Sequence, residues 1–243
     1  MKVTVYSDVA CPWCYIGKRR FETALAGFEH AEQVEVEWRS YQLDPTLPER
    51  SDLTEVEYLT RMKGLAEPQV RRMLDHVVMQ AAGEGLTYDM DAIVVANSFP
   101  AHRVIQRARA VSAEAASALE EALFAAHFER GQDIGDAAVL AELGAAAGLS
   151  AEQVEEALTD ERWAEAVRAD LAEARAVGVT GVPFFVLDGK YAVSGAQPPE
   201  LFAQALAQTW AERAPLRAFT PAAAADDDDA PLIGQACGPD GCA

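Results

Sequence analysis

The chain has 243 residues, of which half are apolar, and it carries a formal net charge of −19. A chain of this length and apolar content can bury a sizeable core, as one large domain or two smaller ones. So negative a surface repels nucleic acid and anionic lipid, and no apolar run reaches the about 18 residues of a membrane-spanning helix. We therefore expect no nucleic-acid partner and no membrane partner.

The start and the cysteine content of the chain suggest a compartment. The first predicted strand begins by Val3, which leaves no room before it for a secretory signal, and Met1 favours a cytosolic protein. Four cysteines are too few for a disulfide scaffold at this length. We expect a cytoplasmic protein whose paired cysteines carry chemistry or bind metal.

The rest of the chain is organised around a Cys-Pro-Trp-Cys motif. An apolar run from Val3 to Tyr6 predicts a buried strand, after which a helix opens at Cys11, with Pro12 well suited to its first turn. Cys11 then lies where unpaired N–H groups and the positive end of the helix dipole favour a thiolate. Cys14 follows on the same helical face, within reach of a disulfide with Cys11.

Two chemistries fit a Cys-x-x-Cys pair, namely disulfide exchange and half of a zinc site. Zinc knuckles usually lie in Gly-rich turns with a second pair at matched spacing, whereas this motif stands between a strand and a helix. We favour exchange, in which a solvent-exposed Cys11 attacks and Cys14 resolves.

The following segment changes from mixed to helical patterning. The first helix ends near Gly27, and alternation over Val34–Trp38 predicts a half-exposed strand. From Pro45 to about Gly178 alanine dominates and strand signals almost vanish. The predicted helices are Leu53–Lys63, Glu67–Ala82, Phe99–Val111, Ala113–Glu129, Ala137–Ala147, Ala151–Leu158 and Asp160–Val177. Capping residues at their starts include Ser112, Asp136, Ser150 and Asp160.

Strand patterns return near the end of the chain. Val182–Leu187 predicts a strand, Asp188-Gly189 a hairpin turn and Tyr191–Ser194 the returning strand. A final amphipathic helix is expected from Glu200 to about Glu212. Residues 1–44 and 179–214 would thus form one discontinuous α/β domain, with 45–178 as an inserted helical domain.

Residues 215–243 have the composition of a solvated tail, with a run of four aspartates at 226–229. The tail ends in a second pair, Cys237 and Cys242. That pair could relay electrons to Cys11 and Cys14, gather a soft metal ion with them, or close a small local disulfide loop. We favour the relay, and the other two roles stay open.

Several motifs together resemble the DsbA-type thioredoxin-fold oxidoreductases, and in particular their FrnE-like branch. They are Asp8–Gly17, Asn97–Arg103, Thr180–Phe184 and Ser194–Gln197. The resemblance covers about residues 1–213. It implies a thioredoxin fold with a large all-helical insertion and an extended C-terminal tail, acting as a thiol:disulfide oxidoreductase on protein or small-molecule disulfides.

The resemblance also implies the substrate-binding residues, which are Pro12, Trp13, Val182 and Pro183. Val182–Pro183 would be a cis peptide beside the cysteines, which leaves the backbone of Val182 to pair with an extended substrate. Trp13 stands where DsbA itself has a histidine, so we expect a weaker oxidant. Protein thiols and disulfides or glutathione would be the redox partners, with no cofactor and no metal.

Other residues carry less specific expectations. Asp8 could relay a proton to Cys14, although an Asp just before a helix is more often a turn or cap residue. His102 is expected to face the active-site groove, and Trp13, Tyr15 and Phe184 are expected to form the apolar rim around the cysteines. A monomer and a homodimer are equally compatible with the sequence.

Two other classes of protein share some of these features. Kappa-type glutathione transferases and hydroxychromene-carboxylate isomerases have this architecture but carry serine at the first cysteine position, so Cys11 with Cys14 argues against them. A soft-metal-binding thiol protein is the second alternative, and it would need a tight stoichiometric site.

Overall fold

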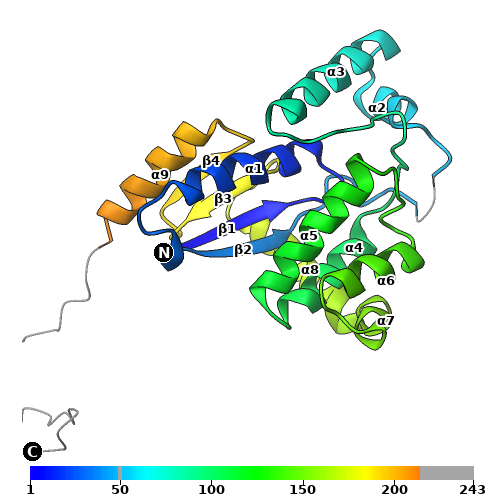
Figure 1. Ribbon diagram of the computed structural model, residues 1–243. Helices are drawn as coiled ribbons and strands as arrows, with labels where there is room; N and C mark the ends of the chain where they lie inside the picture. The colour runs from blue at the N-terminus through cyan, green and yellow to red at the C-terminus, as the bar shows by residue number, and fades with distance from the viewer. Residues whose placement is uncertain (49–50, 214–243) are drawn as a thin grey trace, which may run out of the picture. The chain divides into compact units, whose positions relative to one another are not determined.

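The computed structural model describes residues 1–48 and 51–213 (Figure 1). Contacts divide the chain into two units, Met1–Glu212 and Arg213–Ala243, and of the second unit only Arg213 is described. The predicted tail and its cysteines, Cys237 and Cys242, lie outside the described residues.

The described residues contain a mixed sheet with strand order β2-β1-β3-β4. Its strands are β1 Lys2–Ser7, β2 Glu35–Ser40, β3 Phe184–Leu187 and β4 Tyr191–Ser194. β1 runs parallel to β2 and antiparallel to β3. The predicted hairpin turn is confirmed, since Asp188 and Gly189 both have positive φ, at 48° and 65°.

The helices agree with the predicted segments to within two residues at each end. They are α1 Pro12–Ala26, α2 Glu55–Lys63, α3 Glu67–Gly83, α4 Phe99–Arg109, α5 Ala113–Phe128, α6 Ala137–Ala146, α7 Ala151–Thr159, α8 Glu161–Ala176 and α9 Pro199–Ala211, with the short 3₁₀ helix Ala31–Gln33 before β2. Ser112, Asp136, Ser150 and Asp160 all accept backbone N–H groups as N-caps.

Alternation along β1 directs its side chains to two different layers. Val3 and Val5 point to one face of the sheet, where they share a cluster with Phe21 of α1 and Phe202 of α9. Tyr6 points to the other face and packs with Ala174 of α8. The sheet is therefore covered by α1 and α9 on one face and by α8 on the other, as Figure 1 shows.

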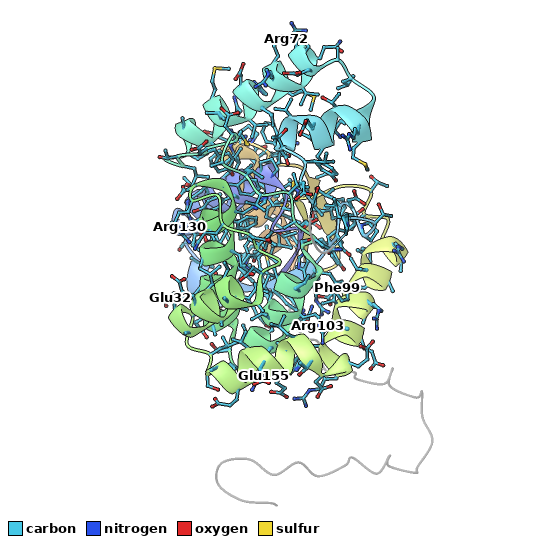
Figure 2. The ribbon with its side chains drawn as sticks, turned by 90° about the vertical axis from the view of Figure 1, so that its right-hand side faces the viewer. Glu32, Arg72, Phe99, Arg103, Arg130 and Glu155 are labelled. Atoms are coloured by element: carbon cyan, nitrogen blue, oxygen red, sulfur yellow. The ribbon has the colours of Figure 1, made fainter. Side chains whose placement is uncertain are left out.

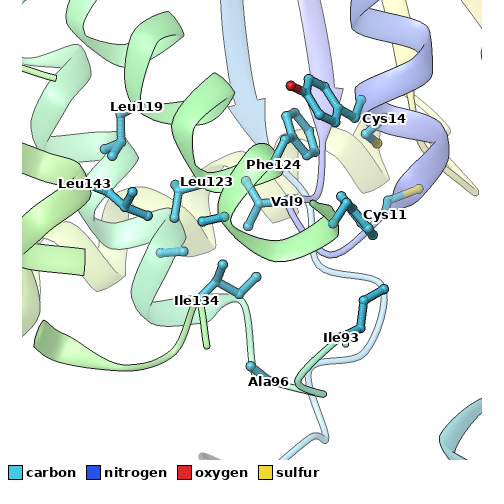
Figure 3. Close-up of a cluster of buried hydrophobic side chains, with 14 of the residues drawn as sticks. Val9, Cys11, Cys14, Ile93, Ala96, Leu119, Leu123, Phe124, Ile134 and Leu143 are labelled. Carbon is cyan, nitrogen blue, oxygen red and sulfur yellow. The ribbon is translucent and has the colours of Figure 1, made fainter. Parts of the chain in front are cut away.

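The segment between β2 and β3 holds α2 to α8, and its apolar core reaches the predicted active site. One buried cluster contains Leu119, Leu123 and Phe124 of α5 together with Cys11 and Cys14 (Figure 3). In Figure 2, α2 and α3 lie at one end of the described helices and α7 at the opposite end. The α2–α3 pair lies toward the start of α1, and its Val56, Val70 and Leu74 belong to the same buried cluster.

Candidate active site

A tight turn sets the position of Cys11 at the start of α1. Cys11 is the N-cap residue and Pro12 occupies the first helical turn, as predicted. The Cys11 N–H donates to the carbonyl oxygen of Asp8 at 2.9 Å, and the Ala10 N–H donates to Asp8 Oδ1 at 3.2 Å. The turn therefore holds the first sulfur beside the free N–H groups of the helix.

The expectation that Cys11 is exposed is wrong. Its side chain keeps only 4 % of its accessible surface, because it packs into the cluster formed with the helical segment. Its Sγ donates to the carbonyl oxygen of Val182 at 3.6 Å. Cys11 still lines a cavity of about 460 Å³, so a ligand in that cavity meets its sulfur.

Cys14 lies deeper in the core and is fully buried. The structure records Cys11 and Cys14 as free thiols. Burial raises the pKa of the Cys14 thiol well above its usual value, and the neighbouring Cys11 raises it further. The Asp8 backbone N–H and the Ser7 hydroxyl lower it by less. Cys14 accordingly keeps its proton at neutral pH.

The loop opposite the cysteines has the backbone that the resemblance implies. The Val182–Pro183 peptide bond is cis, which confirms that expectation. No described residue accepts a hydrogen bond from the Val182 N–H. Gly17 of α1 permits the close approach of this loop, since a Cβ at Gly17 would lie 2.8 Å from Pro183 Cγ.

Asp8 is buried and its carboxylate is occupied by hydrogen bonds. Oδ2 accepts from the Leu43 N–H at 2.7 Å, and Oδ1 lies 3.2 Å from His102 Nε2. Burial raises the pKa of Asp8, but His102 and the backbone donors outweigh it and hold the pKa below its usual value. These contacts favour a turn-stabilising role, and a proton relay through Asp8 stays a prediction. His102 is buried beside Asp8 and is not among the residues that line the cavity.

The predicted apolar rim is only partly formed. Trp13 lines the cavity, with its ring 5.9 Å from that of His76. Tyr15 instead stacks on Phe124 in the core, at a ring distance of 5.0 Å. It follows Trp13 by two residues, which places the two side chains on nearly opposite sides of α1. Phe184 packs in the cluster on the far face of the sheet.

The sequence interpretation missed several ionisable residues in the cavity wall, and Glu55 and His127 have the most unusual environments among them. Burial raises the pKa of Glu55 to about 7 and lowers the pKa of His127 to about 4. Glu55 has the sequence pattern of an ordinary acid in the first turn of a helix, and His127 has no partner at metal-ligand spacing. Only the packing of α2 and α5 around the cavity gives either residue its environment.

A second buried carboxyl lies behind the cysteines. Glu120 of α5 is buried, and burial raises its pKa to about 8. The nearby Ser7 hydroxyl lowers the pKa of both Glu120 and Cys14 by less than burial raises it, and it makes no hydrogen bond within the described residues. Nothing in the sequence distinguishes Glu120 from its neighbour Glu121.

Within residues 1–48 and 51–213, no group of three or more His, Cys, Asp or Glu side chains could hold a metal ion. A metal site shared with the tail cysteines would involve residues outside that part of the chain. Over the same described residues, no helix is both long enough and apolar enough to cross a membrane.

The sheet order, the Cys-x-x-Cys pair at the start of α1 and the cis-proline loop beside it together define a thioredoxin-fold thiol protein. Residues 2–207 match the DsbA-like thioredoxin domain, and the chain belongs to this family of thiol oxidoreductases. The predicted DsbA-type family and the thioredoxin fold with its helical insertion are therefore confirmed, whereas the FrnE-like branch stays a prediction.

Known proteins resemble the chain over most of its length. The crystal structure of a probable DsbA oxidoreductase from Streptomyces coelicolor is 42 % identical, covers 100 % of this chain and 98 % of its own, and has a TM-score of 0.87. The Bacillus subtilis (strain 168) protein YwbO is 26 % identical over 84 % of this chain and 94 % of its own. The cytosolic disulfide reductase DsbM from Pseudomonas aeruginosa, solved with GSH, is 19 % identical, covers 87 % and 100 % of the two chains, and shares the fold at a TM-score of 0.61.

Proposed function

We propose that the protein is a thiol:disulfide oxidoreductase that works through Cys11 and Cys14. The observation that carries this proposal is a pair of free thiols at the N-terminus of α1, one of which lines a cavity beside the cis-proline loop. An attacking sulfur needs access to substrate, and the cavity that Cys11 lines supplies it.

In the reductive direction the Cys11 thiolate attacks one sulfur of a substrate disulfide. The substrate disulfide breaks, a mixed disulfide forms, and the first substrate thiolate leaves with a proton from solvent. Cys14 then loses its proton and attacks Cys11 Sγ, which releases the second substrate thiol and closes the Cys11–Cys14 disulfide. Two electrons pass from the protein to the substrate, and the oxidative direction reverses these steps.

The two cysteines differ in environment in a way that supports this division of labour. Cys11 faces the cavity, whereas the raised pKa of the buried Cys14 thiol keeps it protonated until the mixed disulfide forms beside it. The Val182 N–H has no partner within the described residues, so it is available to an extended substrate segment next to Cys11.

Serine variants of the two cysteines test this assignment. Cys11→Ser should abolish insulin reduction, whereas Cys14→Ser should lose turnover but accumulate a mixed disulfide that mass spectrometry detects. Both variants should keep the wild-type circular dichroism spectrum. Turnover by Cys11→Ser at the wild-type rate would contradict the assignment.

We further propose that Cys237 and Cys242 relay electrons between Cys11–Cys14 and an external partner. Support for the relay comes only from the second cysteine pair in the sequence. Full-length Cys237→Ser/Cys242→Ser protein should reduce a small disulfide once but turn over more slowly with a protein reductant. Identical turnover in the variant and the wild type would remove the relay.

A further inference from the structure

The cavity beside Cys11 has mostly apolar walls supplied by α2 and α3. The apolar residues on these helices that line it are Leu59, Met62, Met73, Leu74 and Val77. Met62 and Met73 are 56 % and 38 % exposed, so both side chains line the cavity and also reach solvent. Methionine adapts its shape to varied apolar ligands, so these walls suit a short apolar arm of variable form.

The ionisable groups that line the cavity are mainly acidic. Among the described residues, the titratable groups that line the cavity together with Glu55 are Asp8 and Cys11 before α1, Asp44 after β2, Tyr58 and Lys63 on α2, and His127 on α5. The α3 residues that line the cavity are apolar. Three acidic residues with a carboxyl group thus line the cavity, against a single lysine, within the described segments.

These carboxyl groups differ in how far they are already occupied. Asp8 is held by His102 and backbone N–H groups. Burial raises the pKa of Asp44, but hydrogen bonds from Thr46 and Tyr58 together outweigh burial and hold the pKa below its usual value. The Glu55 carboxyl group makes no hydrogen bond or ion pair with any described residue, and burial alone shifts its pKa. Its carboxyl group is the one left to interact with a ligand.

A second, independent observation points to a ligand in the same cavity. His127 is only 4 % exposed, and its Nδ1 has no hydrogen-bond partner in the described structure. Because burial lowers its pKa to about 4, the imidazole is neutral at pH 7, with one ring nitrogen interacting with the backbone of Gln132. Nδ1 is then left as a hydrogen-bond acceptor. An unpaired buried polar atom costs free energy, which a donor on a ligand would recover.

We propose that this cavity binds the arm of a disulfide substrate that is apolar along its stem and carries a positive charge, and that Glu55 is the residue that selects that charge. The proposal rests on the proposed disulfide exchange at Cys11. A bound cation gains hydrogen-bond acceptors and Coulombic attraction in a partly desolvated site. A carboxylate arm meets repulsion there, so an anionic disulfide such as glutathione disulfide would react less well.

Three small disulfides of similar length test the proposal. Cystamine carries two ammonium groups, bis(2-hydroxyethyl) disulfide is neutral, and 3,3′-dithiodipropionate carries two carboxylates. The second-order rate constant for oxidation of the reduced full-length protein is measured with each disulfide. It is divided by the rate constant of a small reference thiol with the same disulfide, which corrects for the intrinsic reactivity of that disulfide. We expect the order cation, neutral, anion, with several-fold steps.

Variants and pH assign that order to Glu55. The cation-to-neutral ratio should rise between about pH 6 and 8 as Glu55 ionises, because titration of the attacking thiol cancels from the ratio. Glu55→Gln should lower the ratio several-fold and flatten its pH dependence. The matched control is Asp75→Asn on α3, which removes the same charge from an exposed residue outside the cavity wall and should leave the ratio unchanged.

The outcomes distinguish failure of the charge-selective cavity from failure of disulfide exchange at Cys11 and Cys14. If the protein reacts with all three disulfides at similar normalised rates, prefers the anion, or keeps its cation preference in Glu55→Gln, the charge-selective cavity is overturned while disulfide exchange stands. If none of the three disulfides oxidises Cys11 and Cys14, the proposed function itself fails.

Discussion

Neighbouring acidic residues on α5 show how much a single position depends on its surroundings. Glu121 accepts from Lys18 at 2.8 Å and from the Tyr15 hydroxyl at 2.6 Å, and it also pairs with Arg19. Burial raises its pKa, but these donors outweigh it and hold the pKa below the usual value. Glu120, one residue earlier, faces the core, where burial instead raises its pKa to about 8.

This contrast predicts a pH dependence of stability. Folded Glu120 keeps a proton that the unfolded chain releases above a pKa near 4.5, so stability should fall as pH rises from about 4.5 to 8. The slope from this one group is at most about 1.4 kcal/mol per pH unit. Glu120→Gln, a neutral mimic of the protonated acid, should remove that part of the slope in urea unfolding at pH 5, 6, 7 and 8.

The neighbouring variant Glu121→Gln is the matched control. It leaves the buried Lys18 with weaker pairing, so it should lower the free energy of unfolding by about 3 kcal/mol at neutral pH. The loss should shrink in acid, as the native Glu121 becomes protonated. A Glu120→Gln protein with the wild-type pH slope would mean that Glu120 is ionised in the folded state.

At this scale the sequence predicts chemistry only where a motif marks it. The placement of Cys11 and Cys14 at the start of α1 and the cis Val182–Pro183 bond could be predicted, because the strand–motif–helix order and the resemblance specify them. Glu55 and Glu120 could not be predicted, since their unusual environments come from helices that pack together across long stretches of sequence.

At the scale of elements, the close contact between α1 and the cis-proline loop depends on one missing side chain. Gly17→Ala would place a Cβ 2.8 Å from Pro183 Cγ, so α1 or the loop must move. We expect a loss of about 1–3 kcal/mol in unfolding free energy and slower disulfide exchange, because Val182 would shift relative to Cys11.

The same substitution at the end of α3 should have the opposite effect on stability. Gly83 is helical and a Cβ there would meet no atom within 4 Å. Gly83→Ala should therefore raise stability by up to about 1 kcal/mol and leave exchange unchanged. Denaturant titration and insulin reduction of both variants give the comparison, and equal effects on stability would refute the packing argument for Gly17.

The boundaries of the helices were predictable because local chemistry sets them. Ser112, Asp136 and Ser150 cap the helices that they precede through contacts within three residues. The Gly17 contact was not predictable, since Pro183 is far away along the chain and nothing local marks a glycine inside a helix as a point of close approach.

At the scale of Met1–Glu212 as a unit, a buried carboxylate joins the sheet to the helical segment. Asp170 of α8 accepts from the Ser40 N–H of β2 at 2.9 Å and from Gln106 of α4 at 2.6 Å. Arg39 and Arg109 donate to its two oxygens at 2.8 and 3.0 Å. The sequence predicted each of these elements, but not that a single aspartate would join three of them.

This network predicts how cooperatively the protein unfolds. The apolar cluster extends from α5 to Cys11, and Asp170 joins α4 and α8 to β2. Residues 1–212 should therefore unfold in one transition, although the sequence pattern suggests an inserted domain. Asp170→Ala leaves two arginines without their buried partner and should lower the unfolding free energy by about 3–5 kcal/mol. Unfolding is followed by tryptophan fluorescence, which includes Trp38 on β2, and by far-ultraviolet circular dichroism, which the helices dominate. Within each protein the two probes should give the same midpoint, and that midpoint should be lower in Asp170→Ala than in the wild type. Separate midpoints in the wild-type protein would mean that 45–178 unfolds as a domain of its own, and a wild-type midpoint in Asp170→Ala would show that this carboxylate does not hold the sheet and the helices together.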